Sequence, residues 1–102
     1  MKIGVTSQNF RTITGHAGKT RRFLIYEADT NQPVQEVKRL SLPKEMSIHE
    51  VSPSEPHPVD ELDVLITAGC GDGFRRKMAD RGIQLLVTEE TDPVKAVESL
   101  VE

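Results

Sequence analysis

The first forty residues show the alternation of apolar and polar positions that is typical of β-strands. Ile3 and Val5 fall on one face of the first such segment. The apolar run at 23–26 predicts a second, more deeply buried strand, and turn-forming residues at 29–33 separate it from a third. A short turn between neighbouring strands favours an antiparallel meander. A short edge strand is also expected at 12–14. The three main strands are expected at residues 2–7, 22–28 and 34–42.

Proline interrupts this pattern in the middle of the chain. Residues 43–58 contain four of the six prolines, and proline continues neither a helix interior nor a central strand. We therefore expect a long surface loop here, followed by a single helical turn at 59–62. Loops of this length are often functional.

The C-terminal part changes to an alternation of strands and helices. An apolar run at 63–68 predicts a strand covered on both faces, and a tight glycine turn at 69–73 follows it. Phe74 and Met78 are spaced i and i+4, so a helix is expected after the turn. Its outward side chains are expected to be Arg75, Arg76, Lys77 and Arg81. The helix is expected over residues 74–81, before a stop at Gly82.

A second strand–helix unit completes the pattern. Residues 83–88 predict a buried strand, and Asp92 and Pro93 are residue types preferred at the N-cap and first position of a helix. The apolar stripe expected on that last helix consists of Val94, Val97, Leu100 and Val101. Together the elements predict one α/β domain over residues 1–102. Its mixed sheet of about five strands has an N-terminal antiparallel meander followed by β-α-β-α.

Charge is unevenly distributed along the chain. The 102 residues carry a formal net charge of −3, which argues against a general nucleic-acid binder. Residues 1–26 hold five cations and no carboxylate, whereas the remainder holds eight cations and 16 acids. The basic turn before the second strand is therefore either a solvated hairpin rim or an anion site. It contains His16, Lys19, Arg21 and Arg22.

Cysteine content and hydropathy limit the cellular setting. A single cysteine, Cys70, allows no intramolecular disulfide. The first residues lack the apolar core of a secretory signal peptide, and no apolar run approaches the ~20 residues of a membrane span. We expect a cytoplasmic protein without a membrane partner, either a monomer or a weak homodimer.

The glycine turn at 69–73 is the strongest local signal for a ligand site. It follows a buried strand and leads into a helix N-terminus, where free N–H groups and the helix dipole favour anions. It is not a dinucleotide fingerprint, because its third glycine comes one position early, and no Lys-Ser/Thr pair follows as in a P-loop. Asp72 would repel a phosphate and is more simply a helix cap. Cys70 has no such structural explanation, and a thiolate is favoured near a helix N-terminus.

The residues able to bind a metal, besides Cys70, are three histidines: His16, His49 and His57. They form no Cys-x-x-Cys or His-x-x-x-His spacing, so a self-contained zinc site is not expected. A cysteine hydrolase is also disfavoured, since no third member or oxyanion arrangement is recognisable.

The order of the motifs resembles that of the dinitrogenase iron–molybdenum cofactor-binding family, which includes NifX-type carriers, the NafY cofactor-binding domain and the C-terminal domain of NifB. That family has a first strand like residues 2–5, a His-Phe-Gly turn before a Phe-rich strand and, later, a glycine turn, a helix and a Thr-Glu strand end. The corresponding segments here are 16–20, 23–27, 69–73, 81–83 and 88–91. Ala17 stands in place of the usual Phe, and Thr20 in place of the usual Ala.

The resemblance implies a ribonuclease H-like fold used for binding rather than cleavage. The first strand contains no acid, although a two-metal nuclease of that fold would need one there. The implied function is a non-enzymatic carrier in cofactor biosynthesis for nitrogen fixation. Its cargo would be an anionic iron–sulfur-type metallocluster, the iron–molybdenum cofactor or a related precursor, exchanged with donor or acceptor proteins.

A soft, anionic cluster calls for soft or borderline ligands surrounded by cations. His16 matches the family's binding histidine by position, and Cys70 is the second expected metal ligand. The expected cofactor-binding residues are His16, Gly18, Lys19, Arg21, Arg22, Cys70 and Gly71. Two alternatives remain: a cluster-free scaffold or regulatory protein of the same fold, and a small-anion binder at the glycine turn.

Overall fold

The structure is a computed structural model that describes residues 1–29, 31–52 and 54–101, with the side chain of the last of these left out. Its strands are β1 (Lys2–Thr6), β2 (Arg22–Asp29), β3 (Gln32–Ser41), β4 (Val64–Thr67) and β5 (Gln84–Val87). Its helices are α1 (Asp72–Asp80) and α2 (Pro93–Val101), with 3₁₀-helices η1 (Lys44–Met46) and η2 (Pro58–Glu61). The order of the main strands and α-helices matches the sequence prediction, with most boundaries shifted by one or two residues. The strand expected to be buried at 83–88 is instead an edge strand, β5, whose residues are half-buried or exposed. The 3₁₀-helix η1 was not predicted.

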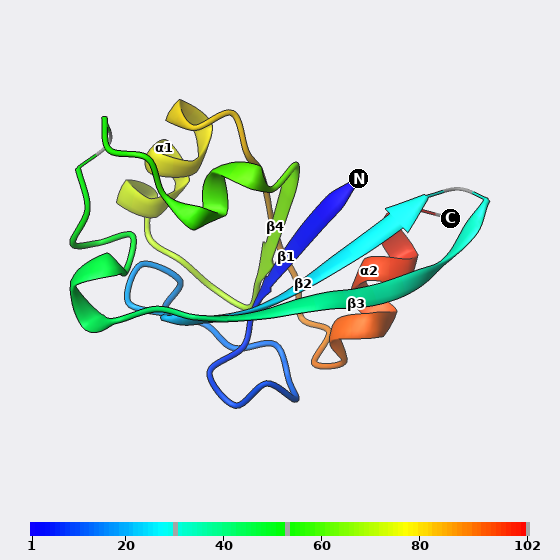
Figure 1. Cartoon of the computed structure of the whole chain (residues 1–102). Coiled ribbons are helices and arrows are strands. Elements are labelled where there is room, and N and C mark those ends of the chain that lie inside the picture. The colour runs from blue at the N-terminus through cyan, green and yellow to red at the C-terminus, as the bar shows by residue number, and fades with distance from the viewer. Residues whose placement is uncertain (30, 53, 102) are drawn as a thin grey trace.

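The strands form one mixed sheet in the order β3-β2-β1-β4-β5 (Figure 1). The hairpin of β2 and β3 and the pair of β1 and β2 are antiparallel, whereas β4 lies parallel to both β1 and β5. An antiparallel meander followed by parallel strands with helical connections is thus confirmed.

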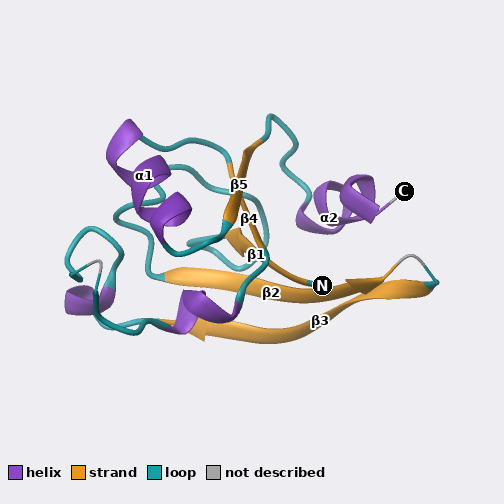
Figure 2. Cartoon of the chain, turned by 90° about the horizontal axis from the view of Figure 1, so that it is seen from above, coloured by secondary structure: helices purple, strands orange, loops and turns teal. Residues whose placement is uncertain are grey.

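The two α-helices cover opposite faces of the sheet (Figure 2). Strand alternation sends Phe23 and Ile25 of β2 to the face covered by α1, and Leu24 and Tyr26 to the face covered by α2. Such a two-sided sheet needs apolar residues at consecutive positions of its central strands, which explains the unbroken run at 23–26. The face covered by α1 carries the candidate site.

The segment at 12–14 is a correction to the prediction, because it forms no strand. Ile13 is buried, but its N–H donates to the carbonyl of Thr91 (2.9 Å), and the next N–H donates to the carbonyl of Thr6 (2.9 Å). The segment therefore bridges the end of β1 and the loop that precedes α2, instead of pairing along one edge of the sheet.

Some of the residues expected to cap the helices do so, and others do not. Gly71, not Asp72, is the N-cap of α1, and no side chain caps that end. Gly82 adopts a left-handed φ of +73° just beyond α1, as the stop signal predicted. Asp92 caps α2 through its carboxylate, which accepts the N–H of Val94 at 2.9 Å.

In the apolar stripe of α2, Val97 is buried and Leu100 packs against the same cluster, as predicted. Val94 is 42% exposed, contrary to the prediction, and Ala96 is buried. The side chain of residue 101 lies outside the described part of the chain.

Arg81 was expected to point outward, but its side chain is only 6% exposed. Its guanidinium donates to Asp60 at 2.6 Å and to the carbonyl of Ser52 at 3.2 Å. The guanidinium charge can be buried here because both of its terminal nitrogens donate hydrogen bonds. Arg81 therefore ties the end of α1 to η2 and to the proline-rich loop.

In the part of the chain that the structure describes, no helix is both long enough and apolar enough to cross a membrane.

Lowering the pH should weaken the ion pair between Arg81 and Asp60. Partial burial alone would raise the pKa of Asp60, but the His57 N–H and the Arg81 guanidinium outweigh it and hold that pKa below its usual value. A folded pKa below the unfolded one means that the carboxylate stabilises the fold above about pH 4 and loses this contribution as the pH falls through the folded pKa. In urea titrations, the stability difference between wild type and Asp60→Asn should shrink from about pH 6 to about pH 3.

The control for this titration is Glu98→Gln, because the described residues give that exposed carboxylate no hydrogen bond or ion pair. The stability of this variant in urea should equal that of the wild type across the titration. A stability difference for Asp60→Asn that stays constant with pH would contradict the assignment.

Candidate functional site

The first wall of the site is the basic turn between β1 and β2. His16 has a left-handed φ of 53°, a conformation in which histidine is more common than most residues. Its carbonyl accepts the N–H groups of Lys19 (2.9 Å) and Thr20 (3.1 Å), which closes a compact turn. The Thr20 hydroxyl lies 3.3 Å from both the His16 and the Gly15 carbonyl oxygens. The turn is thus held from inside, and the imidazole is left exposed.

The second wall is the glycine turn between β4 and α1. Two backbone hydrogen bonds join it to the first wall: Ala17 N–H to the Gly69 carbonyl (3.3 Å), and Ala68 N–H to the Thr14 carbonyl (3.2 Å). Ala17 is fully buried in the core cluster that also contains Phe74. The turn expected to carry a histidine and the turn expected to carry a cysteine therefore meet at the carboxyl ends of β1 and β4.

Two buried threonines fix this junction from below. Thr6 ends β1 and Thr67 ends β4, and their hydroxyl oxygens lie 2.8 Å apart. The Thr6 hydroxyl donates to the Thr14 carbonyl at 2.6 Å, and the Thr67 hydroxyl oxygen lies 3.2 Å from the Gly69 carbonyl. This pair leaves no recognisable signal in the sequence, because threonine is common in strands and the two residues have no characteristic spacing.

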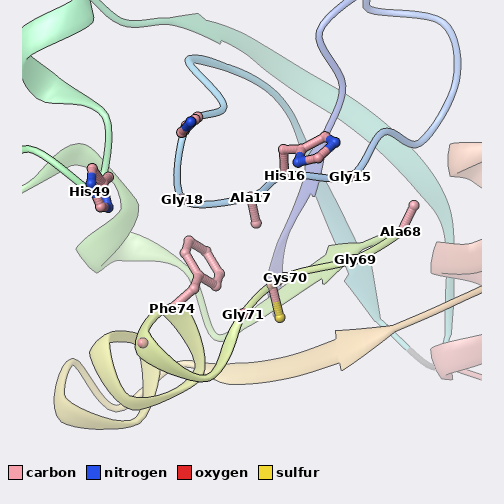
Figure 3. A pocket seen from close by; sticks show the side chains of 12 residues that line it. Gly15, His16, Ala17, Gly18, His49, Ala68, Gly69, Cys70, Gly71 and Phe74 are labelled. Carbon is pink, nitrogen blue, oxygen red and sulfur yellow. The ribbon is translucent and has the colours of Figure 1, made fainter.

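Between the two walls lies an open cavity of about 710 Å³ (Figure 3). Five of the predicted site residues line it: His16, Gly18, Lys19, Cys70 and Gly71. Small residues make up most of the remaining wall, and none of the described residues that line it is acidic. Its chemistry combines imidazole, thiol and ammonium groups with free N–H groups at the start of α1, which suits an anion with soft metal atoms.

The structure separates the two arginines from the other expected residues. Arg21 borders a neighbouring hollow of about 530 Å³, together with Lys19 and Lys44. Arg22 begins β2 and faces the side of the sheet opposite the cavity, because the next residue, Phe23, faces the cavity side. Its guanidinium donates to the Gln8 carbonyl at 3.1 Å and lies 5.5 Å from the centre of the Phe10 ring.

The other two histidines have different positions. His49 lines the cavity and was not among the predicted site residues, since nothing in the spacing of the proline-rich loop identified it. His57 is buried: its Nδ1 accepts the Val59 N–H (3.1 Å), so its Nε2 donates to the Met46 carbonyl (2.6 Å). With both ring nitrogens occupied, His57 is a capping residue of η2 and not a ligand.

No three His, Cys, Asp or Glu side chains within residues 1–29, 31–52 and 54–101 lie close enough together to hold a metal ion.

The fold and the cavity define a small mixed α/β protein with an open cavity at the ends of parallel strands, to which none of the described residues contributes a carboxylate. The chain belongs to the dinitrogenase iron–molybdenum cofactor family, whose model matches residues 1–102. Its fold is similar to that in the crystal structure of PH0822, with a TM-score of 0.75 and 14% sequence identity, over 99% of this chain and 90% of that one. No curated protein gives a significant sequence match.

Proposed function

We propose that this protein is a non-enzymatic carrier that binds an anionic iron–sulfur-type metallocluster as its cargo. The cargo would be the iron–molybdenum cofactor or a related precursor, exchanged with donor and acceptor proteins during cofactor biosynthesis. The observation that carries the proposal is the convergence of His16 and Cys70, far apart in the sequence, on one cavity with Lys19. Membership of the family supports the nature of the cargo.

The donor set fits such a cargo better than it fits a single ion. Imidazole and thiolate are borderline and soft ligands that suit iron and molybdenum in a sulfide environment. A cluster arrives with most of its metal coordination filled by its own sulfides, so it needs few protein ligands. The ammonium group of Lys19 and the N-terminus of α1 offset its negative charge. The cavity volume, about 710 Å³, lies within the range of ordinary ligand pockets, roughly 300–1,000 Å³.

We further propose that the chain is a single domain with a ribonuclease H-like fold, acting in the cytoplasm as a monomer or weak homodimer. The sheet order β3-β2-β1-β4-β5, with an antiparallel meander beside parallel strands, supports the fold assignment. The proposed site comprises His16, Gly18, Lys19, Cys70 and Gly71, with Arg21 at its margin. Arg22 contributes positive charge only at long range, because its side chain lies on the opposite face of the sheet.

Anaerobic loading tests the proposal. Wild-type protein treated with iron and sulfide, or with extracted cofactor, should acquire charge-transfer absorption, and His16→Ala should lose it. His16→Asn is the more stringent variant, because asparagine tolerates the left-handed backbone of residue 16 while lacking the imidazole. Circular dichroism should show both variants folded.

The matched control is Arg22→Ala, which removes a cation of the same segment from the face opposite the cavity. It should load nearly as well as the wild type. Unchanged absorption in both His16 variants would refute the ligand assignment. A wild-type protein that takes up no cluster would refute the carrier function and favour a scaffold that acts through protein contacts.

A further inference from the structure

His49 reaches the cavity from the proline-rich segment, a part of the chain whose sequence indicated only a surface loop. It lines both the main cavity and the neighbouring basic hollow. In Figure 3, His49 and His16 lie on either side of Gly18, with Cys70 on the glycine turn. Residues with soft or borderline donor groups therefore line the cavity from three separate segments.

The backbone of His49 is fixed although its side chain is exposed. Its N–H donates to the Gly18 carbonyl at 2.9 Å, which joins it directly to the turn that carries His16. The preceding residue, Ile48, is 1% exposed in the core, and its carbonyl accepts Lys77 Nζ at 3.3 Å. A buried anchor on one side and a hydrogen bond to the opposite turn hold His49 at the cavity edge.

The spacing of the donors indicates the size of what they bind. One metal ion needs every ligand atom within roughly 2.0–2.3 Å of itself. Within the described ranges, no three His, Cys, Asp or Glu side chains are close enough for that, although His16, His49 and Cys70 share one cavity. A polynuclear cluster presents several metal atoms on different sides, so separated donors can each bind a different one.

We propose that His49 is a further ligand of the cargo. Together with His16 and Cys70 it makes the cavity selective for a polynuclear cluster over single metal ions. In the bound state a neutral imidazole nitrogen of His49 donates its lone pair to a metal atom other than the one bound by His16. The inference rests on the proposed carrier function and adds to it a ligand and a basis for selectivity.

Isotope labelling tests this ligand directly. Protein with ¹⁵N-labelled histidine is loaded anaerobically with iron and sulfide, reduced, and measured by pulsed EPR. The wild type should show two classes of coupled histidine nitrogen, and His49→Ala should show one. Release of iron to a chelator should be roughly ten times faster or more in His49→Ala, because even changes outside the ligand set cost metal sites about 10- to 100-fold in affinity. His49→Cys, which keeps a soft donor, should restore slow release with a shifted absorption band.

The control is Glu50→Gln, which changes an exposed neighbour that lines the basic hollow but not the main cavity. It should load and release like the wild type. In a second experiment the protein is titrated with Co²⁺, and no tight one-to-one binding of this single metal ion is expected.

Failure of this inference can be distinguished from failure of the carrier function. Loss of loading in His16→Ala with unchanged nitrogen couplings and release in His49→Ala would overturn the role of His49 and leave the carrier function standing. Tight Co²⁺ binding that His49→Ala abolishes would overturn the selectivity for clusters. A wild-type protein that takes up no cluster would overturn both the function and the inference.

Discussion

Replacing Phe23 with alanine should lower the free energy of unfolding by about 3–5 kcal/mol, since truncating a buried phenylalanine removes its transfer free energy and leaves a cavity. Phe23 is fully buried near the start of β2, in the core cluster formed with Leu65, Phe74 and Met78. That cluster joins the central strands to α1 beneath the candidate site. The free energy of unfolding of a native protein is roughly 5–15 kcal/mol in total, so the variant should be close to the limit of stable folding.

Urea unfolding followed by circular dichroism measures this effect. Val37→Ala is the matched control: Val37 is 46% exposed on β3, so its truncation should change stability by no more than about 0.5 kcal/mol. If Phe23→Ala fails to fold, Phe23→Leu provides a smaller truncation whose transition can be measured. A loss below about 1 kcal/mol in Phe23→Ala would show that the cluster is not the main core.

The second large effect is expected at the threonine pair beneath the site. Thr67→Val keeps the shape of the side chain but removes a fully buried hydroxyl. The Thr6 hydroxyl and the Gly69 carbonyl each lose one partner but keep another, the Thr14 carbonyl and the Ala17 N–H respectively. The expected cost is therefore that of a lost buried hydrogen bond, about 0.5–1.5 kcal/mol. Stability should fall by that amount, and the junction between the two turns should loosen.

Amide hydrogen exchange locates this loosening. The amides of Ala17 and Ala68 donate across the junction and should exchange faster in Thr67→Val, whereas the amides of the β2–β3 hairpin should be affected much less. A loaded protein should also release its cluster faster, although no proposed ligand is changed. Thr91→Val, at an exposed threonine, should match the wild type in all three measurements. Unaltered exchange at Ala17 and Ala68 in Thr67→Val would contradict the role of the pair.

The elements of the fold were largely readable from local pattern. The consecutive apolar positions of β2 and β4, the Asp-Pro start of α2 and the left-handed Gly82 after α1 each reflect a local backbone or burial preference. The errors arose where tertiary contacts override local preference. Ile13 is buried without being in a strand, and the basic side chain of Arg81 is buried because Asp60 and Ser52 receive it.

In the candidate site, too, some features are local and could be predicted, whereas others depend on tertiary contacts. The left-handed turn that presents His16 and the glycine turn that carries Cys70 are local features, and each was recognisable by itself. Whether the two turns face each other depends on the parallel pairing of β1 with β4, a contact between segments far apart in the chain. The exclusion of Arg22 from the cavity depends on the alternation of β2, which can be interpreted only once one face of the sheet is known to carry the site.

By itself, therefore, the sequence determined the order of the main elements and the two turns with candidate ligands, because these depend on neighbours along the chain. Only the tertiary structure decided that His16 and Cys70 share a cavity and that His49 joins them while His57 does not. The physical reason is that side chains from three separate segments converge through strand pairing, a buried threonine pair and backbone hydrogen bonds across loops. None of these contacts leaves a periodic signal in the sequence.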